Sequence, residues 1–363
     1  MRAVLLALAA GTLVAAPGSL SQLPGPSVGD LRVVAVSPDG RTVYAAGGVG
    51  SLGVLDVFAR DRRTGSLTQL AGRAGCIRRL KTHACATGLG LETPAGVAVS
   101  PSGKLVVTTA QNGRSLGVYR RRASGALTPL GSVKGFDQPS GLVFRSDGKL
   151  LLVADRSGVV SLRIRGTKLT RVSGATCEEF AGCNAVAFSP DGGFAYGVAG
   201  GGAHGSVTVF TVAPEGTVVA IAPALAHAVK QPLSIAVAPD GRNVYVVGSV
   251  SDSVVTFSRD ATTGLLVQTG CITMTGSRGA CAKGKGIAGA WSVAVSRDGK
   301  NVYVASYASK TVTTFVRAAD GTLRQTQVLD PRGLTRATAV AVSPDGRNVY
   351  AAGRGGVAAF ARR

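Results

Sequence analysis

The sequence predicts an all-β fold: a seven-bladed β-propeller with four-stranded antiparallel blades, in which an N-terminal strand closes the last blade. A turn of the Ser-Pro-Asp-Gly type occurs seven times, about every 51 residues. Each turn stands between two short apolar runs rich in Val and Ala, which suit strands better than helices. The seventh copy ends at Arg363 before a fourth strand, and a matching segment precedes the first copy. Four strands repeated at this spacing are typical of a propeller.

The recurring turn predicts the hairpin between the first and second strands of each blade. Pro presets φ, Asp bonds back to the backbone and Gly adopts positive φ, which together make a tight turn. In the first copy, apolar residues 33–36 precede the turn and residues 43–46 follow it. The seven turns begin at Ser37, Ser100, Arg145, Ser189, Ala238, Ser296 and Ser343.

The third and fourth strands follow each hairpin. The third apolar run ends in a large residue, and a polar turn then leads to a fourth run such as residues 65–70. The large residues are Phe58, Tyr119, Leu162, Phe210, Phe257, Phe315 and Phe360. Residues 18–23 match the pattern of residues 65–70, so we expect them to supply the fourth strand of the seventh blade. A ring closed in this way leaves no blade incomplete.

The N-terminus predicts export. Residues 1–16 combine Arg2 with an apolar run and small residues, which is typical of a secretory signal peptide. An N-terminal anchor that is never cleaved is the alternative. We therefore expect residues 17–363 to form a single propeller domain that is secreted or located in the periplasm or cell envelope. The apolar run is too short to span a bilayer.

The six cysteines form three local pairs, and we expect each pair to be a disulfide. An even number of closely spaced cysteines in an exported chain favours disulfides. The alternative, a zinc site, is not favoured because no C-x-x-C spacing occurs. We expect no metal and no cofactor. The predicted pairs are Cys76 with Cys85, Cys177 with Cys183, and Cys271 with Cys281.

The net charge is +21, from 40 basic and 19 acidic residues. Such a surface attracts polyanions, for example an anionic polymer or an acidic glycan. A protein partner is an alternative, and the basic composition can also arise without any function. Aromatic residues do not interleave with the charges, so nucleic acid is not expected as a partner. We expect a monomer.

The repeats resemble those of a known family. Residues 301–305 read Asn-Val-Tyr-Val-Ala, and residues 243–246 and 348–350 carry the same Asn-Val-Tyr start. These motifs resemble the YVTN-type repeat of propellers that are similar to the 6-phosphogluconolactonase-like lactonases. The resemblance covers about residues 18–363. It implies the propeller fold and, as an activity, hydrolysis of a sugar lactone, although no catalytic residue of the family can be placed on a matching motif.

Candidate ligand-binding residues lie on one face. The loops after the second and fourth strands share a face, and the cysteine pairs fall on connections into the next blade. Long loops held in this way often carry function. We expect two basic loops to flank the channel mouth, and Trp291 to lie near the mouth, where it can stack on a ligand. The candidates are Arg78, Arg79, Lys81, Lys283, Lys285 and Trp291.

Residues that enter the first strand of each blade should crowd the channel. Small residues at one aligned position, such as Gly96 and Gly141, allow seven inner strands to converge. The position before it holds a varied set: Arg32, Ala95, Ser140, Asn184, Leu233, Trp291 and Thr338.

Catalytic candidates are few. A lactonase needs a carboxylate or His to activate water and a cation to hold the oxyanion. His204, His227, Asp155, Arg156 and Arg354 fit these roles by residue type. The G-x-S-x-G match at residues 113–117 is not a nucleophile elbow, because a loop between strands replaces the helix that the elbow needs.

Two functions remain open from the sequence. The first is a propeller that acts as a binding or interaction module, with its ligand at the disulfide-containing loop face. The alternative is a lactonase-type hydrolase that acts on a sugar lactone. Because no catalytic motif stands out, the sequence ranks binding first and leaves enzymatic activity open.

Overall fold

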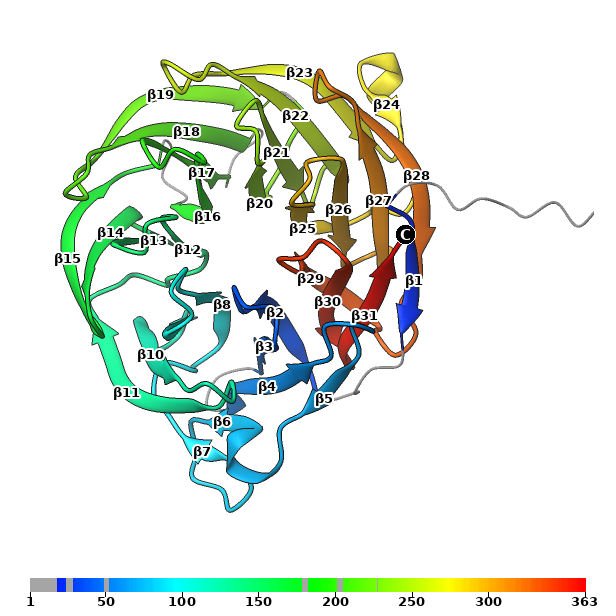
Figure 1. Ribbon diagram of the computed structural model, residues 1–363. Helices are drawn as coiled ribbons and strands as arrows, with labels where there is room; N and C mark the ends of the chain where they lie inside the picture. The colour runs from blue at the N-terminus through cyan, green and yellow to red at the C-terminus, as the bar shows by residue number, and fades with distance from the viewer. Residues whose placement is uncertain (1–17, 24–28, 49–51, 178–181, 201–204, 227) are drawn as a thin grey trace, which may run out of the picture.

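Seven sheets surround a central axis and form a closed ring (Figure 1). The computed structural model describes residues 18–23, 29–48, 52–177, 182–200, 205–226 and 228–363. The predicted seven-bladed all-β propeller is confirmed. The predicted signal peptide, residues 1–16, lies outside the described residues. Within the described part of the chain, no helix is long and apolar enough to cross a membrane.

The blades follow the chain in order, from the inner strand outward. Blade 1 contains β2 (Leu31–Val36), β3 (Thr42–Gly47), β4 (Val54–Arg60), β5 (Leu67–Gln69), β6 (Cys76–Arg78) and β7 (Ala86–Thr87). Blade 2 contains β8 (Pro94–Val99), β9 (Leu105–Ala110), β10 (Ser115–Arg121) and β11 (Leu127–Lys134). Blade 3 contains β12 (Leu142–Phe144), β13 (Leu150–Asp155), β14 (Gly158–Arg165) and β15 (Lys168–Ala175). Blade 4 contains β16 (Cys183–Phe188), β17 (Phe194–Ala199), β18 (Gly205–Val212) and β19 (Val218–Ala226).

The remaining blades complete the ring. Blade 5 contains β20 (Pro232–Val237), β21 (Asn243–Gly248), β22 (Ser253–Arg259), β23 (Leu266–Thr273) and β24 (Ala282–Lys283). Blade 6 contains β25 (Ala290–Val295), β26 (Asn301–Ser306), β27 (Thr311–Arg317) and β28 (Leu323–Leu329). Blade 7 contains β29 (Arg336–Val342), β30 (Asn348–Arg354), β31 (Gly356–Arg362) and β1 (Leu20–Leu23). Two 3-10 turns lie in the long connections, η2 (Gly72–Ala74) and η3 (Ser277–Gly279).

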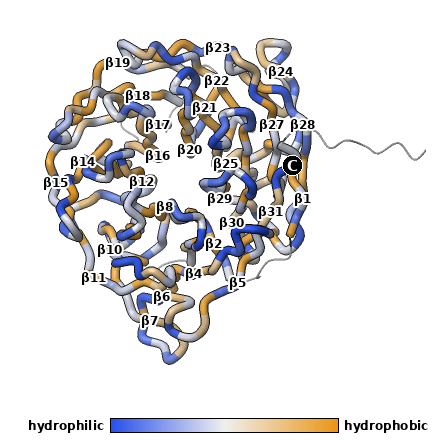
Figure 2. The backbone as a smooth tube through the Cα atoms, in the orientation of Figure 1, coloured by the Kyte–Doolittle hydropathy of each residue, from blue (hydrophilic) through white to orange (hydrophobic). Residues whose placement is uncertain are grey.

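The hydrophobic core lies between the blades. The described residues form seven clusters of buried apolar side chains, and each cluster joins two neighbouring sheets. The large residues predicted to end the third strands, from Phe58 to Phe360, are all fully buried. Figure 2 shows apolar colour along strands such as β14 and β18, with polar colour in many of the connecting turns. Burial between flat sheets therefore holds each blade to the next.

The ring closes as the sequence predicts. β1 pairs antiparallel with β31, with Leu20 opposite Arg362 and Leu23 opposite Ala359. Gly18 has φ of +77° and packs against the Asn301 side chain of blade 6, where a Cβ atom would leave no room. Gly65 makes the same approach to Asn348 of blade 7. Residues 18–23 thus occupy the fourth-strand position that residues 65–70 occupy in blade 1.

The predicted hairpin turns lie at one end of the channel, which we call the turn face; the opposite end is the loop face. Each Asp of these turns accepts a hydrogen bond from its own turn, as in Ser37 Oγ to Asp39 at 2.6 Å. Five seams between blades add an arginine clasp, in which the Arg at the end of a third strand reaches the turn of the preceding blade. The five are Arg60, Arg121, Arg259, Arg317 and Arg362.

The clasp between blades 1 and 7 shows the pattern. The fully buried Arg60 side chain donates from Nη2 to Asp345 at 2.9 Å, from Nη1 to the Gly40 carbonyl at 2.8 Å and from Nε to Tyr350 Oη at 2.7 Å. Tyr350 Oη in turn donates to the Gly65 carbonyl at 2.9 Å. The guanidinium group of Arg60 therefore links the hairpin of blade 1, through Gly40, to the hairpin of blade 7, through Asp345 and Tyr350.

Two blades carry more than the four strands that the sequence predicts. β7 pairs in parallel with β6, and β24 pairs in parallel with β23. The two added segments share a sequence pattern, Gly-Cys-Ile followed by Ala-Cys-Ala. In blade 1 the two parts are residues 75–77 and 84–86, and in blade 5 they are residues 270–272 and 280–282. In each, a disulfide holds the returning segment beside the strand that it left.

Candidate functional site

In six of the seven inner strands, a β-bulge places one residue at the channel mouth. In β2, Leu31 lies opposite Gly47 and Val33 opposite Ala46, so Arg32 is an extra residue without a partner. The same register shift occurs in β8, β16, β20, β25 and β29. A bulge bends the strand and changes the direction of a side chain, and bulges often stand beside functional sites.

The bulge residues line a hollow of about 940 Å³ on the loop face, and Ser140 joins them from the segment just before β12. All seven residues that the sequence places before the small inner position contribute to it: Arg32, Ala95, Ser140, Asn184, Leu233, Trp291 and Thr338. Residues at the ends of second strands complete the wall, among them Gln111, Tyr307 and Arg354. Asp30 and Arg336 lie in the same wall. We call this hollow the mouth pocket.

One side of the mouth pocket is an aromatic and cationic stack. The rings of Trp291 and Tyr307 lie 5.2 Å apart between centroids, at an interplanar angle of 30°. The Arg336 guanidinium lies over the Tyr307 ring, 4.7 Å from its centroid. Trp291 remains 39% exposed, so the stack presents a flat apolar face to solvent. Such a surface suits a ligand with an apolar face and polar edges.

The charged groups of the mouth pocket are mostly cationic. Arg32, Arg336 and Arg354 line it, and Asp30 is the only carboxylate among the described lining residues. Arg354 Nε lies 3.7 Å from Asp30 Oδ1, and both side chains are more than half exposed. A pair this exposed adds little stability. The two groups therefore remain available to a ligand.

Three neutral polar side chains of the pocket donate hydrogen bonds to backbone carbonyls. Asn184 Nδ2 donates to the Pro232 carbonyl at 2.8 Å, across the seam to blade 5. Thr338 Oγ1 donates to the Arg32 carbonyl at 3.0 Å, across the seam to blade 1. Ser140 Oγ reaches the carbonyls of Ala154 and Cys183, each at 3.1 Å. These contacts fix the wall, because each side chain is bonded to a neighbouring strand or blade.

The structure separates the catalytic candidates. Arg354 lies in the mouth pocket. Asp155 is buried at the end of β13 and accepts hydrogen bonds from the backbone of Asp137 and Ser157, so its carboxylate holds a turn. Arg156 is exposed beside it and does not line the pocket. His204 and His227 lie outside the described residues.

The basic loops lie elsewhere than expected. Trp291 lines the mouth pocket, but Arg78, Arg79, Lys81, Lys283 and Lys285 do not. Figure 1 shows β6, β7 and β24 at the outer edge of the ring. The expectation that these loops flank the channel mouth is wrong, because β6 and β24 extend the outer side of their sheets. Arg79 is also engaged, with Nε donating to Glu92 at 2.7 Å.

The three predicted disulfides are present: Cys76–Cys85, Cys177–Cys183 and Cys271–Cys281. They indicate folding in an oxidising environment. Cys183 begins β16 one residue before Asn184, so its disulfide anchors the strand that carries a pocket residue. Among the described residues, no group of three or more His, Cys, Asp or Glu side chains is placed to hold a metal ion.

Sequence reasoning missed Asp30, Gln111, Tyr307 and Arg336. A signal existed for two of them, because Gln111 and Tyr307 occupy the repeat position of Arg354, at the end of the second strand. Asp30 stands just before β2 and Arg336 begins β29, where the connections vary in length and alignment by repeats fails. Their approach to the pocket is visible only once the ring is closed.

Comparison with known proteins gives both the fold and the family. The periplasmic gluconolactonase of Pseudomonas aeruginosa matches with a TM-score of 0.68, 22% identity and coverage of 89% of this chain and 92% of that one. A Bacteroides uniformis protein described as a candidate 6-phosphogluconolactonase matches with a TM-score of 0.66, 21% identity and coverage of 82% and 84%. Hydrazine synthase of Kuenenia stuttgartiensis matches with a TM-score of 0.67, 18% identity and coverage of 98% and 99%. Similarity at these identities shows the fold alone.

A search among curated proteins gave no match. The family model described as "Lactonase, 7-bladed beta-propeller" matches residues 161–283 and 288–361, which is just over half of the chain. This match covers the repeats that carry the Asn-Val-Tyr motifs, and the structure supplies the seven blades. The chain therefore belongs to the seven-bladed β-propeller lactonase family.

Proposed function

We propose that this protein hydrolyses a sugar lactone in the mouth pocket and acts outside the cytoplasm. Family membership supports a lactonase, and the three disulfides support an oxidising compartment. The observation that carries the proposal is the grouping, in one hollow of about 940 Å³, of an aromatic stack, three guanidinium groups and one carboxylate.

The aromatic stack fits a sugar ring. A lactone derived from a sugar has an apolar C–H face and hydroxyl groups at its edges. Trp291 offers a partly exposed ring for that face, and Tyr307 supports it from behind. Stacking of this kind contributes contact area at small entropic cost, because an aromatic side chain has few rotatable bonds. Trp291 would therefore bind and orient the ring.

The charged groups fit the ring opening. The oxygen of water attacks the lactone carbonyl carbon, and the resulting tetrahedral intermediate carries negative charge on the former carbonyl oxygen. Asp30 would accept the proton of the attacking water, and an arginine of the pocket would stabilise the oxyanion. The bond between the carbonyl carbon and the ring oxygen then breaks, and Asp30 would return the proton to the ring oxygen as it leaves. The product is a hydroxy acid, whose carboxylate the arginines also suit.

The binding-module hypothesis has less support. It rested on the absence of a catalytic motif in the sequence, and the basic loops expected to assist binding lie at the outer edge of the ring. The family match favours hydrolysis instead. Ligand binding without turnover is therefore an outcome of the test rather than a second proposal.

Acid release from a panel of lactones tests the proposal. We expect the purified chain to hydrolyse at least one δ- or γ-lactone of a sugar acid faster than buffer does. Asp30→Asn should lower kcat by roughly 100-fold or more, which is the usual contribution of a general base. Trp291→Ala should mainly raise KM, because it removes a contact that binds the ring before and during reaction.

Arg78→Gln serves as the control, because it removes a cation from the outer edge and should leave both constants unchanged. Retention of a lactone or hydroxy acid without turnover would replace the hydrolase with a binding propeller. Equal loss of activity in the Arg78 variant would show that overall charge, rather than the mouth pocket, governs the reaction.

A further inference from the structure

The turn face carries two smaller hollows where blades 6, 7 and 1 meet. One, of about 380 Å³, is lined by Arg62, Arg63, Asp345 and Arg347. The other, of about 300 Å³, is lined by Pro38, Asp39, Gly40, Arg62, Arg297, Pro344 and Asp345. They share Arg62 and Asp345, so they adjoin. None of their residues lines the mouth pocket at the other end of the channel.

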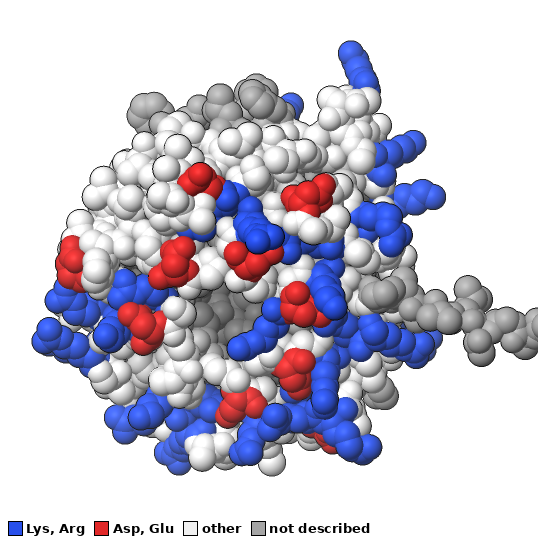
Figure 3. Space-filling model, turned by 45° about the horizontal axis from the view of Figure 1, so that its top comes forward, with Lys and Arg blue, Asp and Glu red and all other residues white. Residues whose placement is uncertain are grey.

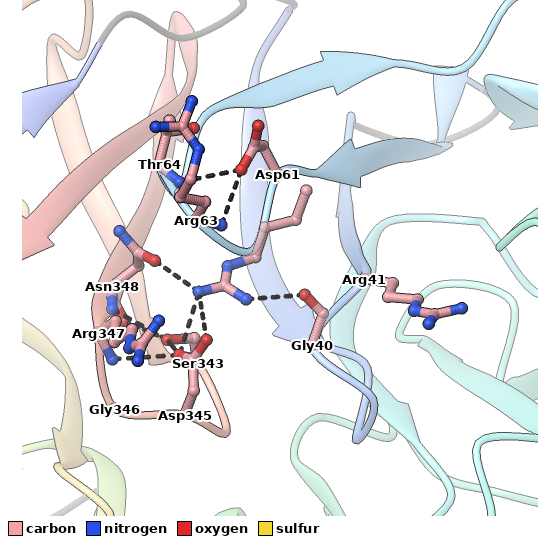
Figure 4. Close-up of polar contacts among 12 residues, drawn as sticks. Gly40, Arg41, Asp61, Arg63, Thr64, Ser343, Asp345, Gly346, Arg347 and Asn348 are labelled. Carbon is pink, nitrogen blue, oxygen red and sulfur yellow. Dashed lines mark hydrogen bonds and ion pairs between the residues drawn. The ribbon is translucent and has the colours of Figure 1, made fainter.

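Four arginines line these hollows without a hydrogen-bonded partner for their side chains among the described residues. Arg62, Arg63, Arg297 and Arg347 are exposed, and no hydrogen bond or ion pair of their side chains occurs with the described residues. In Figure 4, Arg347 lies beside Asp345 on blade 7, and Arg63 lies with Asp61 on blade 1. Figure 3 shows basic side chains interspersed with carboxylates around the central hollow.

The two carboxylates that line these hollows, Asp39 and Asp345, are already ion-paired. Arg121 Nη2 lies 2.8 Å from Asp39 Oδ2. Asp345 accepts two hydrogen bonds from Arg60 Nη2, at 2.9 and 3.0 Å, and another from Ser343 Oγ at 2.6 Å. Partial burial alone would raise the pKa of the Asp345 carboxyl, but these bonds and that from the Arg347 backbone lower it. The remaining guanidinium groups therefore leave an excess of positive charge.

The fold does not need these arginines, as the other blades of the same chain show. The turn at residues 260–264 has Ala261 and Thr262 where blade 1 has Arg62 and Arg63. Its backbone bonds are the same: Thr262 and Thr263 donate to Asp260 at 2.9 and 2.7 Å, and Arg63 and Thr64 donate to Asp61 at 2.7 and 2.9 Å.

Arg297 departs from the repeat in the same region. It stands second in its turn, where five of the seven copies have Pro: Pro38, Pro101, Pro190, Pro239 and Pro344. Proline is the residue that the turn geometry favours at this position. An arginine there gives up that preference and adds a cation to the second hollow.

We propose that these two hollows form a binding site for linked phosphates, as in an oligophosphate chain or a phosphodiester polymer. Guanidinium groups bind phosphate oxygens in pairs and keep their charge at any physiological pH. Two adjoining hollows that share Arg62 suit two phosphates joined by a short link. The site lies on the turn face and is independent of hydrolysis in the mouth pocket.

Calorimetric titration of the full chain at fixed salt tests the site. The probes are inorganic phosphate, tripolyphosphate and an oligomer of glycerol phosphate. We expect tripolyphosphate or the oligomer to bind at least about tenfold more tightly than phosphate, because only linked groups can occupy both hollows. The two linked probes distinguish a free oligophosphate from a phosphodiester polymer as the preferred source.

The test variant takes its residues from the chain's own repeats: Arg62→Ala and Arg63→Thr give the turn of blade 5, and Arg297→Pro restores the common turn. It should lose at least about tenfold in affinity and keep its Tm in phosphate-free buffer. The control also removes three cations, from exposed turn positions of blades 2, 3 and 5, by Lys104→Gln, Lys149→Gln and Arg242→Gln, and should bind as wild type. Equal binding by the test variant, equal loss in the control, or no preference for linked phosphate would each overturn the proposal.

Discussion

One residue in each blade decides what the channel mouth offers. The bulged position is free of pairing, so its side chain varies from Ala95 to Trp291 while the strands around it keep their register. Alignment of the repeats found all seven of these residues from the sequence. Alignment could not find Asp30 or Arg336. These two residues reach the mouth pocket only because the ring closes and because the loops differ from blade to blade.

Asp56 is a buried carboxyl group whose charge opposes folding. It is 2% exposed in β4, and burial raises its pKa to about 6 although Arg78 acts to lower it. A pKa above the unfolded value of about 4 means that the folded state binds the proton more tightly. Folding stability should therefore fall as pH rises from about 4 to 6, by up to roughly 3 kcal/mol.

Asp56→Asn should remove this penalty. We expect the variant to have a higher Tm than wild type at pH 8, with the difference shrinking below pH 4, as measured by thermal unfolding across pH. Asp260→Asn is a control whose effect on Tm should have the opposite sign. Hydrogen bonds from Thr263 and Thr262 lower the pKa of the Asp260 carboxyl, so its charged form favours folding and the variant should have a lower Tm than wild type at pH 8. A constant difference between wild type and Asp56→Asn at all pH values would contradict the assignment.

At the scale of the elements, the arginine clasp accounts for how the turns vary. In β14, Ile164 occupies the repeat position of the clasp arginine, and the turn of the preceding blade has Ser102 instead of Asp. Where the third strand ends in Val212, Arg145 of the turn itself binds Asp147 at 2.8 Å and the carbonyls of Ala213 and Pro214 of blade 4. The Asp of the turn thus persists only where an arginine can reach it.

The clasp between blades 5 and 6 allows a direct test. Arg317 Nε donates to Tyr245 Oη at 2.9 Å and Nη2 binds Asp240 at 2.8 Å, with the Arg317 side chain 6% exposed. Arg317→Ile should cost about 2 kcal/mol, chiefly because buried partners lose a donor; the exposed Asp240 contributes less. The measurement is the Tm of the variant.

A double variant that combines Arg317→Ile with Asp240→Ser has the same two residues as the natural seam between blades 2 and 3, which has Ile164 and Ser102. The double variant should be less destabilised than the sum of the two single variants, because the pair interaction is lost only once. Strictly additive changes in Tm would show that Arg317 and Asp240 do not interact.

At the scale of the whole molecule, the repeat predicted the ring and the closing strand correctly. The periodic turns specify each hairpin locally, and residues 18–23 fit the single vacant fourth-strand position. The added strands β7 and β24 were not predicted, because two-residue parallel pairs leave no periodic pattern and depend on their disulfides. The predicted position of the basic loops was wrong for the same reason, because these loops belong to the added segments.

Removal of residues 18–23 should open blade 7. β31 would become an exposed edge, and Tyr303 Oη would lose the Gly18 carbonyl to which it donates at 3.2 Å. We expect a lower Tm and concentration-dependent association, measured by thermal unfolding and by light scattering after gel filtration. Leu20→Ser, which keeps the backbone pairing but removes a buried side chain, should lower Tm without association.

The pairing of β1 with β31 also sets an order of assembly. Leu20 pairs with Arg362, far along the chain, whereas the other six blades are built from strands that are near one another in sequence. Those six sheets can therefore form from local contacts, while β1 must wait for a distant partner. A chain interrupted anywhere before β31 therefore leaves this β1 edge uncapped, which would mark truncated products for recognition by chaperones or proteases.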